Sequence, residues 1–180
     1  MIETLMNMDT SMIIWIQEHM RADWLNPVFI LITTLGDGGM IWIIGSAALL
    51  ISKKTRQVGI MCLVALTLSY LVNNLMLKNL VGRARPFEAI SSIIPLIPRP
   101  ADSSFPSGHS AASFASAWLM FRKLPKKFGI PALVLAVLIA FSRLYIGVHY
   151  PSDVIAGILS GIMLGYLAEM ILNLKGHYKS

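Results

Sequence analysis

Residues 130–174 read IPALVLAVLIAFSRLYIGVHYPSDVIAGILSGIMLGYLAEMILNL, which is two long apolar runs joined by a short polar turn. The two runs, Ile130–Ile146 and Val154–Leu174, come close to the roughly 20 apolar residues that a helix needs to cross a bilayer core of about 30 Å. Three further apolar runs precede them, at Met40–Ser52, Val58–Leu77 and Ser110–Met120. The pattern predicts an all-α fold, a polytopic membrane helical bundle with about five spanning helices.

The overall composition supports the same fold class. Of the 180 residues, 56% are hydrophobic and 13% are charged, against roughly 45–50% and about 25% in an ordinary soluble domain. So few charges cannot coat the whole particle for water, so much of its surface must face lipid. The length predicts one membrane-embedded domain, residues 1–180. The single cysteine, Cys62, excludes a disulfide framework within the chain and a metal site built from several cysteines.

The segment before the first run is amphipathic and does not resemble a spanning helix. Within Asp9–Met20, helical spacing places Met12, Ile13, Ile16 and Met20 on one face. A second apolar stretch, Trp24–Leu35, is broken by the glycines of 36–39. We expect residues 1–38 to form an interfacial or re-entrant N-terminal segment.

The net charge of +6 is explained by topology. If the five runs alternate across the bilayer, nine basic residues fall on one side: Lys53, Lys54, Arg56, Arg122, Lys123, Lys126, Lys127, Lys175 and Lys179. The positive-inside rule makes that side cytoplasmic. We therefore predict a multi-pass protein of the cell membrane with no nucleic-acid partner, and expect the 78–108 loop and the 147–152 turn on the extracellular or periplasmic face.

Three polar clusters lie at this predicted outer face. They are LMLKNLVGRARPFE (75–88), SSFPSGHSAASF (103–114) and FSRLYIGVHYPSDV (141–154). Because all three lie at the same ends of their helices, they can converge although they are distant in sequence. Residues 78–153 are thus the candidate catalytic region.

The residue types in these clusters suit phosphoryl transfer. Lys78, Arg85 and Arg143 supply cationic donors for phosphate oxygens. Free backbone N–H groups at Ser107, Gly108 and His109, at a helix N-terminus, would add an anion site.

Two histidines could carry the chemistry. A neutral His149 could attack phosphorus, with the carboxylate of Asp153 fixing its tautomer. His109 could protonate the leaving group and later activate water.

The three clusters contain Lys78-x6-Arg85-Pro86, then Pro106-Ser107-Gly108-His109, then Ser142-Arg143-x5-His149-x3-Asp153. This series resembles the three-part signature of the type 2 phosphatidic acid phosphatase superfamily, membrane lipid phosphatases related to vanadium haloperoxidases. The sequence is most similar to the bacterial undecaprenyl-diphosphate phosphatase type. Larger bacterial relatives have a further span ahead of the amphipathic segment, which this sequence does not show.

The resemblance implies an integral membrane hydrolase, acting on phosphoester or phosphoanhydride bonds, that needs no metal and no cofactor. It implies a phosphohistidine intermediate on His149, with His109 as acid and base and Asp153 as the orienting carboxylate. It assigns phosphate binding to Lys78, Arg85, Ser107, Gly108 and Arg143.

Several functions stay open at this point. The expected reaction converts undecaprenyl diphosphate to undecaprenyl phosphate, and phosphatidylglycerophosphate and phosphatidic acid are alternative substrates. A protein of another class would bind or transport lipid phosphates without hydrolysis. A zinc hydrolase using His109, His149 and Asp153 is a further alternative. The expected partners are a lipid phosphate or diphosphate and the membrane lipids, and the sequence leaves the oligomeric state open.

Two groups of residues fall outside this signature. Arg83 and Arg99 match no position in it, so we expect both to contact lipid headgroups. Gly157, Gly161 and Gly165 form a stripe at helical spacing, which predicts close helix packing.

Overall fold

The computed structural model describes residues 2–177, and within that range the chain forms helices and turns without a strand. Lys179, the last member of the predicted cytoplasmic charge set, lies outside the described residues. The helices run in the following order: α1 Ile2–His19, α2 Asn26–Leu35, the 3-10 turn η1 Asp37–Gly39, α3 Met40–Ile51, α4 Arg56–Ser69, the π-helical segment η2 Tyr70–Leu77, α5 Lys78–Val81, α6 Pro86–Ala89, α7 Gly108–Lys123, α8 Lys126–Tyr145 and α9 Pro151–His177.

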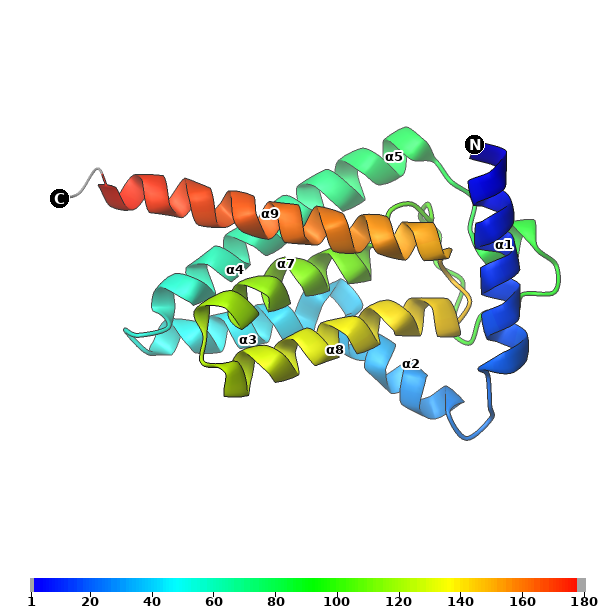
Figure 1. The fold of residues 1–180 in the computed structure, drawn as a ribbon, viewed down its shortest axis with the longest axis horizontal. Coiled ribbons are helices and arrows are strands. Elements are labelled where there is room, and N and C mark those ends of the chain that lie inside the picture. Colours follow the sequence, from blue (N-terminus) through cyan, green and yellow to red (C-terminus); the bar gives the residue numbers. More distant parts are fainter. Residues whose placement is uncertain (1, 178–180) are drawn as a thin grey trace.

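Helix α7 is the centre of the bundle and packs against α3, α4, α8 and α9 (Figure 1). Its contact with α9 is close because the predicted glycine stripe faces it. A Cβ at Gly157 would lie 2.5 Å from the carbonyl oxygen of Ser107, and one at Gly165 would lie 3.1 Å from that of Ala115. A Cβ at Gly161 would overlap the carbonyl oxygen of Ala111. The prediction of close helix packing at these glycines is confirmed.

Three helical stretches are long and apolar enough to cross a membrane: Arg56–Ala89, Lys126–Tyr145 and Pro151–Asn173. A fourth candidate is the pair formed by α2 and the η1–α3 stretch, which meet at an angle of 44°. The remaining predicted span, α7, has 16 residues, most of them buried among its neighbours. The apolar helices identify a membrane protein. The bent pair of α2 and α3 has the form of a broken span or of a re-entrant loop, and the second is one of the two forms predicted for this segment.

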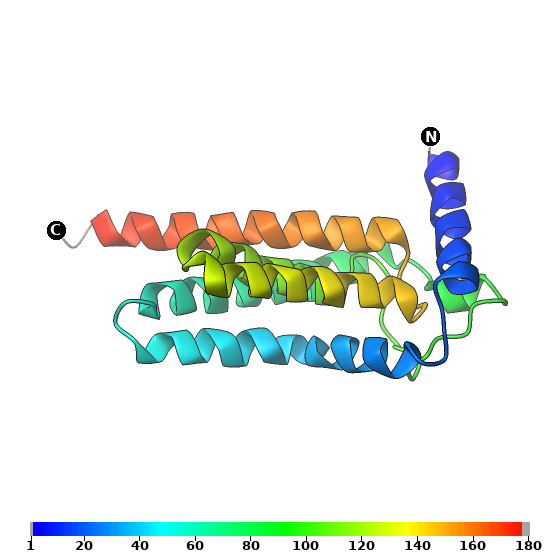
Figure 2. The ribbon, with the colours of Figure 1, turned by 60° about the horizontal axis from the view of Figure 1, so that its bottom comes forward.

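Helix α1 lies across one end of the bundle, at a steep angle to the other long helices (Figure 2). It buries Ile13 in a cluster that includes Tyr145 and Val148, and Ile16 is also buried. Met12 and Met20, predicted on the same face, are instead 48% and 38% exposed. Only part of the predicted apolar face of α1 therefore packs on the protein.

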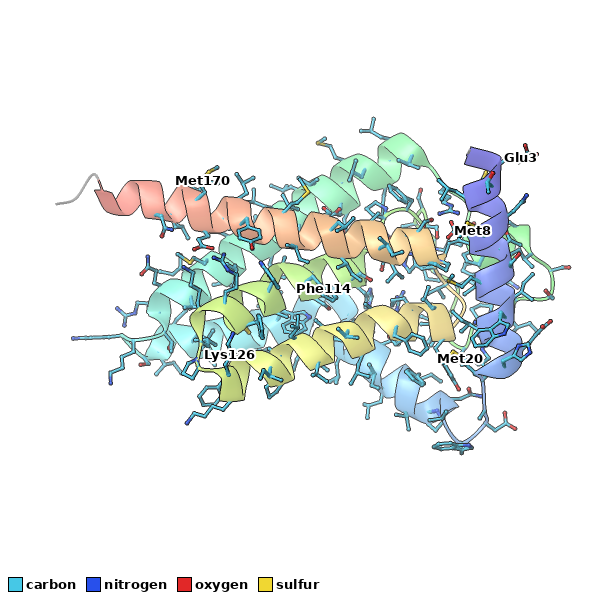
Figure 3. All side chains as sticks on the ribbon, viewed as in Figure 1. Glu3, Met8, Met20, Phe114, Lys126 and Met170 are labelled. Atoms are coloured by element: carbon cyan, nitrogen blue, oxygen red, sulfur yellow. The ribbon has the colours of Figure 1, made fainter. Side chains whose placement is uncertain are left out.

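The basic turns gather at the opposite end from α1. The α3–α4 and α7–α8 turns and the C-terminal end of α9 lie together at that end in Figure 1. Figure 3 shows Lys126 there, at the start of α8, whereas Glu3 and Met8 lie on α1 at the other end. The bundle thus separates the basic turns from the end at which the polar clusters meet.

Candidate active site

The three polar clusters meet at the α1 end of the bundle, around a cavity of about 640 Å³. The predicted residues that line it are Lys78, Arg85, Gly108, His109, Arg143 and His149. The two other predicted residues, Ser107 and Asp153, are buried in the surrounding protein. The structure therefore brings together residues from the start of α5, the start of α6, the start of α7, the end of α8 and the α8–α9 turn.

Lys78 and Arg85 reach the cavity from either side of a sharp change in chain direction. Lys78 begins α5, which ends at Gly82 with a φ of +60°. Arg85 precedes α6 and is 2% exposed. Its Nη1 donates to the carbonyl oxygen of Val148 over 2.8 Å and lies 3.3 Å from Nε2 of His149. The guanidinium is thereby held against the predicted nucleophile.

His149 and Asp153 form a buried pair at the start of α9. One carboxylate oxygen of Asp153, Oδ2, lies 3.5 Å from Nδ1 of His149. The same oxygen accepts hydrogen bonds from the Ser104 hydroxyl at 2.5 Å and from the Tyr150 N–H at 2.9 Å. With the carboxylate at Nδ1, the proton of a neutral imidazole is favoured there and Nε2 keeps its lone pair.

The imidazole of His149 is kept neutral by its surroundings. Burial lowers the pKa of His149 to about 3, and the positive charges of Arg143 and Arg85 act in the same direction, whereas Asp153 opposes them. A histidine with this pKa is unprotonated at neutral pH. It can therefore act as a nucleophile without first losing a proton.

His109 is paired with a residue that sequence reasoning missed, Asp37. Oδ1 of Asp37 lies 2.9 Å from Nε2 of His109. The η1 turn approaches this closely because of Gly36, where a Cβ would lie 2.8 Å from Cδ2 of His109. An acidic residue among the glycines of 36–39 was the available signal, but it had no spacing relation to the three clusters.

Arg143 lies between His109 and α2. Its Nη1 donates to the Thr33 hydroxyl at 2.5 Å and lies 3.5 Å from Nε2 of His109. Its Nε is buried and has no hydrogen-bond partner among the described residues. A buried donor without a partner at a cavity wall is suited to an anionic ligand.

The start of α7 differs from the prediction at one atom. The backbone N–H of Ser107 donates to the carbonyl oxygen of Asp153 at 3.0 Å, so the expected free N–H at Ser107 is wrong. The reason is the close packing of α9 on α7. The Ser107 side chain caps α7 and accepts from the N–H of Ser110. Gly108 lines the cavity, and a Cβ there would lie 3.1 Å from the Asn74 amide.

Asp102 is a second carboxylate that sequence reasoning missed. Its Oδ1 accepts from Arg85 at 2.7 Å, and its Oδ2 pairs with Lys78. Partial burial acts to raise the pKa of Asp102, but the hydrogen bonds and charges of Lys78 and Arg85 outweigh it and lower that pKa to about 2. The two predicted phosphate ligands are thus held by a carboxylate. A lone aspartate in a loop without periodicity gave no sequence signal for this.

The predicted zinc ligands do not form a common metal-binding group. His109 pairs with Asp37, whereas His149 pairs with Asp153. Within residues 2–177, no group of three or more histidine, cysteine, aspartate or glutamate side chains is arranged to hold a metal ion.

Comparison with known proteins gives consistent matches. The family model of the PAP2 superfamily matches residues 59–175. The chain is 36% identical over 131 residues to an undecaprenyl-diphosphatase of Sulfolobus acidocaldarius, covering 73% of this chain and 63% of that protein. It is 34% identical over 128 residues to undecaprenyl-diphosphatase BcrC of Bacillus subtilis, covering 71% and 61%. The chain thus spans less than two thirds of the length of these two relatives.

The fold is also found in solved structures. The crystal structure of a transmembrane PAP2 type phosphatidylglycerolphosphate phosphatase from Bacillus subtilis superimposes with a TM-score of 0.77 and 30% sequence identity. The superposition covers 94% of this chain and 87% of that one. Since the family model spans all three polar clusters and the fold agrees, the chain belongs to the PAP2 superfamily.

Proposed function

We propose that this protein is an integral membrane lipid phosphatase that converts undecaprenyl diphosphate to undecaprenyl phosphate through a phosphohistidine intermediate on His149. The observation that carries the proposal is the environment of His149. Its Nδ1 faces Asp153, and its Nε2 faces Arg85 at the wall of the cavity. A neutral imidazole is thus aimed at a place where cationic side chains can hold phosphate.

The first step forms one bond and breaks another. Nε2 of His149 attacks phosphorus, and the bond from phosphorus to the leaving oxygen breaks. Burial and the neighbouring cations lower the pKa of His109, and the Asp37 carboxylate at its Nε2 opposes them. Nδ1 of His109 would donate a proton to the leaving oxygen. Lys78, Arg85, Gly108 and Arg143 would surround the phosphate oxygens.

The second step restores the enzyme. His109, now neutral, takes a proton from water as the water oxygen attacks the phosphohistidine. The bond between phosphorus and Nε2 of His149 breaks, and inorganic phosphate leaves. Asp153 stays ionised throughout and holds the proton of His149 on Nδ1.

The cavity supports a lipid substrate because one of its walls is apolar. Ile43 of α3 and Leu63, Leu66 and Tyr70 of α4 and η2 continue the lining beyond the charged residues. A phosphate held by the cations would therefore leave its isoprenoid chain among these helices. The basic turns at the other end of the bundle support a site at the outer face of the cell membrane in a multi-pass topology.

The proposal is tested with the purified protein in detergent, in metal-free buffer that contains a chelator. We expect release of one phosphate from undecaprenyl diphosphate, and no release by the His149→Ala variant. Acid-labile radiolabelled phosphate should be trapped on the parent and absent from that variant. Parent protein that releases no phosphate under these conditions would contradict the proposal.

The same two proteins, the parent and His149→Ala, also distinguish the proposed function from two others. The likeness to the Bacillus subtilis phosphatidylglycerolphosphate phosphatase makes that lipid the first alternative substrate, and the two kcat/KM values decide between them. A carrier would need the cations but no histidine paired with a carboxylate. Equal lipid transfer across vesicles by the parent and by His149→Ala, without phosphate release, would favour a carrier.

A further inference from the structure

Arg83 is 20% exposed and lies beside Asp153, where its side chain joins three parts of the chain. Its Nη1 donates to Oδ1 of Asp153 at 2.6 Å and to the Ser152 hydroxyl at 2.8 Å. Its Nη2 donates to Oδ2 of Asp9 at 2.7 Å. The guanidinium also lies 4.0 Å from the centre of the Tyr150 ring. Arg83 was expected at lipid headgroups, but its donors are directed to carboxylates inside the protein.

The two oxygens of Asp153 are divided between Arg83 and His149. Oδ1 accepts from Arg83, while Oδ2 faces His149 and accepts from Ser104 and from the Tyr150 N–H. The backbone carbonyl of Arg83 also accepts from the N–H of Ser104 at 2.8 Å. Arg83 therefore restrains Asp153 directly through Oδ1 and indirectly through Ser104.

Asp9 connects this arrangement to α1. Its carboxylate pairs with Arg83 and accepts from the backbone N–H of Ser152 at 2.9 Å, at the first turn of α9. Asp9 is 7% exposed although it lies on a helix at the end of the bundle. A buried carboxylate needs its charge compensated, and Arg83 provides that compensation.

We propose that Arg83 is a positioning residue of the phosphatase reaction, holding the Asp153 carboxylate on His149, and that Asp9 of α1 holds Arg83 in place. This inference rests on the proposed function. Arg83 does not line the cavity, so it acts through Asp153 and not on the substrate. The bridge makes α1 part of the catalytic apparatus.

The charge of Arg83 bears on the basicity of His149 as well as on its orientation. The groups that face the imidazole are Arg85, Ser104 and Asp153, and the charge of Arg143 acts on it from α8. Of these only Asp153 favours the imidazolium, and Arg83 offsets its charge. Without Arg83, the carboxylate would stabilise imidazolium more strongly and the pKa of His149 would rise.

The experiment compares the full-length parent with Arg83→Gln, Arg83→Lys and Asp9→Asn. Because Arg83 does not line the cavity, Arg83→Gln should lower kcat by about 100-fold, the scale of a small misplacement of a reacting group, with little change in KM. For Arg83→Gln, kcat/KM at acidic pH divided by kcat/KM at neutral pH should be lower than for the parent. Arg83→Lys should recover part of kcat, because it keeps the charge.

Asp9→Asn gives an effect of opposite sign on the pH profile. It loosens Arg83, so kcat should fall, but it leaves the positive charge beside Asp153 unbalanced. The ratio of kcat/KM at acidic pH to kcat/KM at neutral pH should therefore exceed that of the parent. A residue that only stabilised the fold would give no such pair of opposite shifts. The double variant should be no slower than Arg83→Gln alone, because both substitutions break one bridge.

The matched control is Arg99→Gln, which removes another arginine from the same loop. Arg99 lies over the ring of Phe87 and forms no ion pair within the described part of the chain. It should keep the parental kcat. Parental kcat in a folded Arg83→Gln variant would overturn the proposal. If that variant fails to fold, as judged by thermal unfolding in detergent, Asp9→Asn decides alone, and parental kcat there would overturn it equally.

The outcome is distinguishable from failure of the proposed function. If the parent releases no phosphate, or if His149→Ala retains turnover, the proposed reaction itself is wrong. If both behave as expected while Arg83→Gln matches the parent, only the role of Arg83 is wrong.

Discussion

Oδ1 of Asp37 lies 2.9 Å from Nε2 of His109, and this contact joins the glycine turn after α2 to the first turn of α7. It gives the site two separate pairs of histidine and aspartate. The side chains of His149 and Asp153 are 2% and 0% exposed, whereas those of His109 and Asp37 are 19% and 61% exposed. The two histidines therefore have different surroundings, as expected for one nucleophile and one acid.

The Asp37→Asn variant should lose activity at alkaline pH first. Burial and the neighbouring cations already lower the pKa of His109, and the Asp37 carboxylate opposes them. Its removal therefore lowers that pKa further, and the basic limb of the kcat profile moves to lower pH. We expect kcat at the optimum to fall by about 10- to 100-fold, within the range for losing a general acid. If kcat falls by the same factor at every pH, with no shift of the basic limb, this role for Asp37 is contradicted.

Replacing Asp102 should strengthen product inhibition. The Asp102 carboxylate occupies Lys78 and Arg85, so a phosphate ion must compete with it. In Asp102→Asn the inhibition constant of inorganic phosphate should fall up to about fivefold, the range for partly exposed ion pairs of about 1 kcal/mol or less. Asp23→Asn, which removes an exposed carboxylate outside the cavity lining, is the control. Unchanged or weaker phosphate inhibition in Asp102→Asn would show that the carboxylate does not compete.

The low pKa of His149 makes stability depend on pH. The group titrates near 3 when folded and near 6.5 when unfolded, so below about pH 6.5 the unfolded chain binds more protons. Stability is therefore fully present above pH 6.5 and is lost progressively as pH falls toward 3. The Tm of the parent should drop more between about pH 7 and pH 5 than that of His149→Gln. Equal drops would mean that His149 is not held neutral by the fold.

The close approach at Gly36 is tested by adding one methyl group. A Cβ at this position would lie 2.8 Å from Cδ2 of His109 and 2.9 Å from Cγ2 of Ile139. Gly36→Ala should therefore push His109 away from Asp37 and lower kcat by about 100-fold. Gly45→Ala is the matched control on α3, because its Cβ would lie 3.8 Å from Cε of Met120, an ordinary contact. It should keep parental kcat, and equal losses in both variants would point to a general effect on α2 and α3.

The sequence was sufficient to predict a residue's position where that position follows from helix periodicity or from the side of the membrane on which it lies. The apolar runs predicted α3, the stretch formed by α4 and η2, α8 and α9 close to their observed bounds. Placing Lys78, Arg143 and His149 at the same ends of their helices predicted that they would meet, and all three line one cavity. The catalytic roles themselves stay predictions.

The sequence was insufficient where a position depends on a turn or on contact between distant segments. Asp37 reaches His109 only because Gly38 and Gly39 adopt positive φ values of 57° and 71°. Asp102 meets Lys78 through the path of a loop without regular structure. The use of the Ser107 N–H follows from how closely α9 packs on α7. None of these contacts follows from a regular spacing of residues, so the sequence pattern did not predict them.

The bridge from α1 to the start of α9 also orders events during biosynthesis. Asp9 and Ser152 are 143 residues apart and joined by a direct hydrogen bond. Asp9 therefore cannot meet this partner before residue 152 has been synthesised. Under the proposed role of Arg83, a growing chain that already contains Lys78 and Arg85 would be able to bind a phosphate group before it could cleave one.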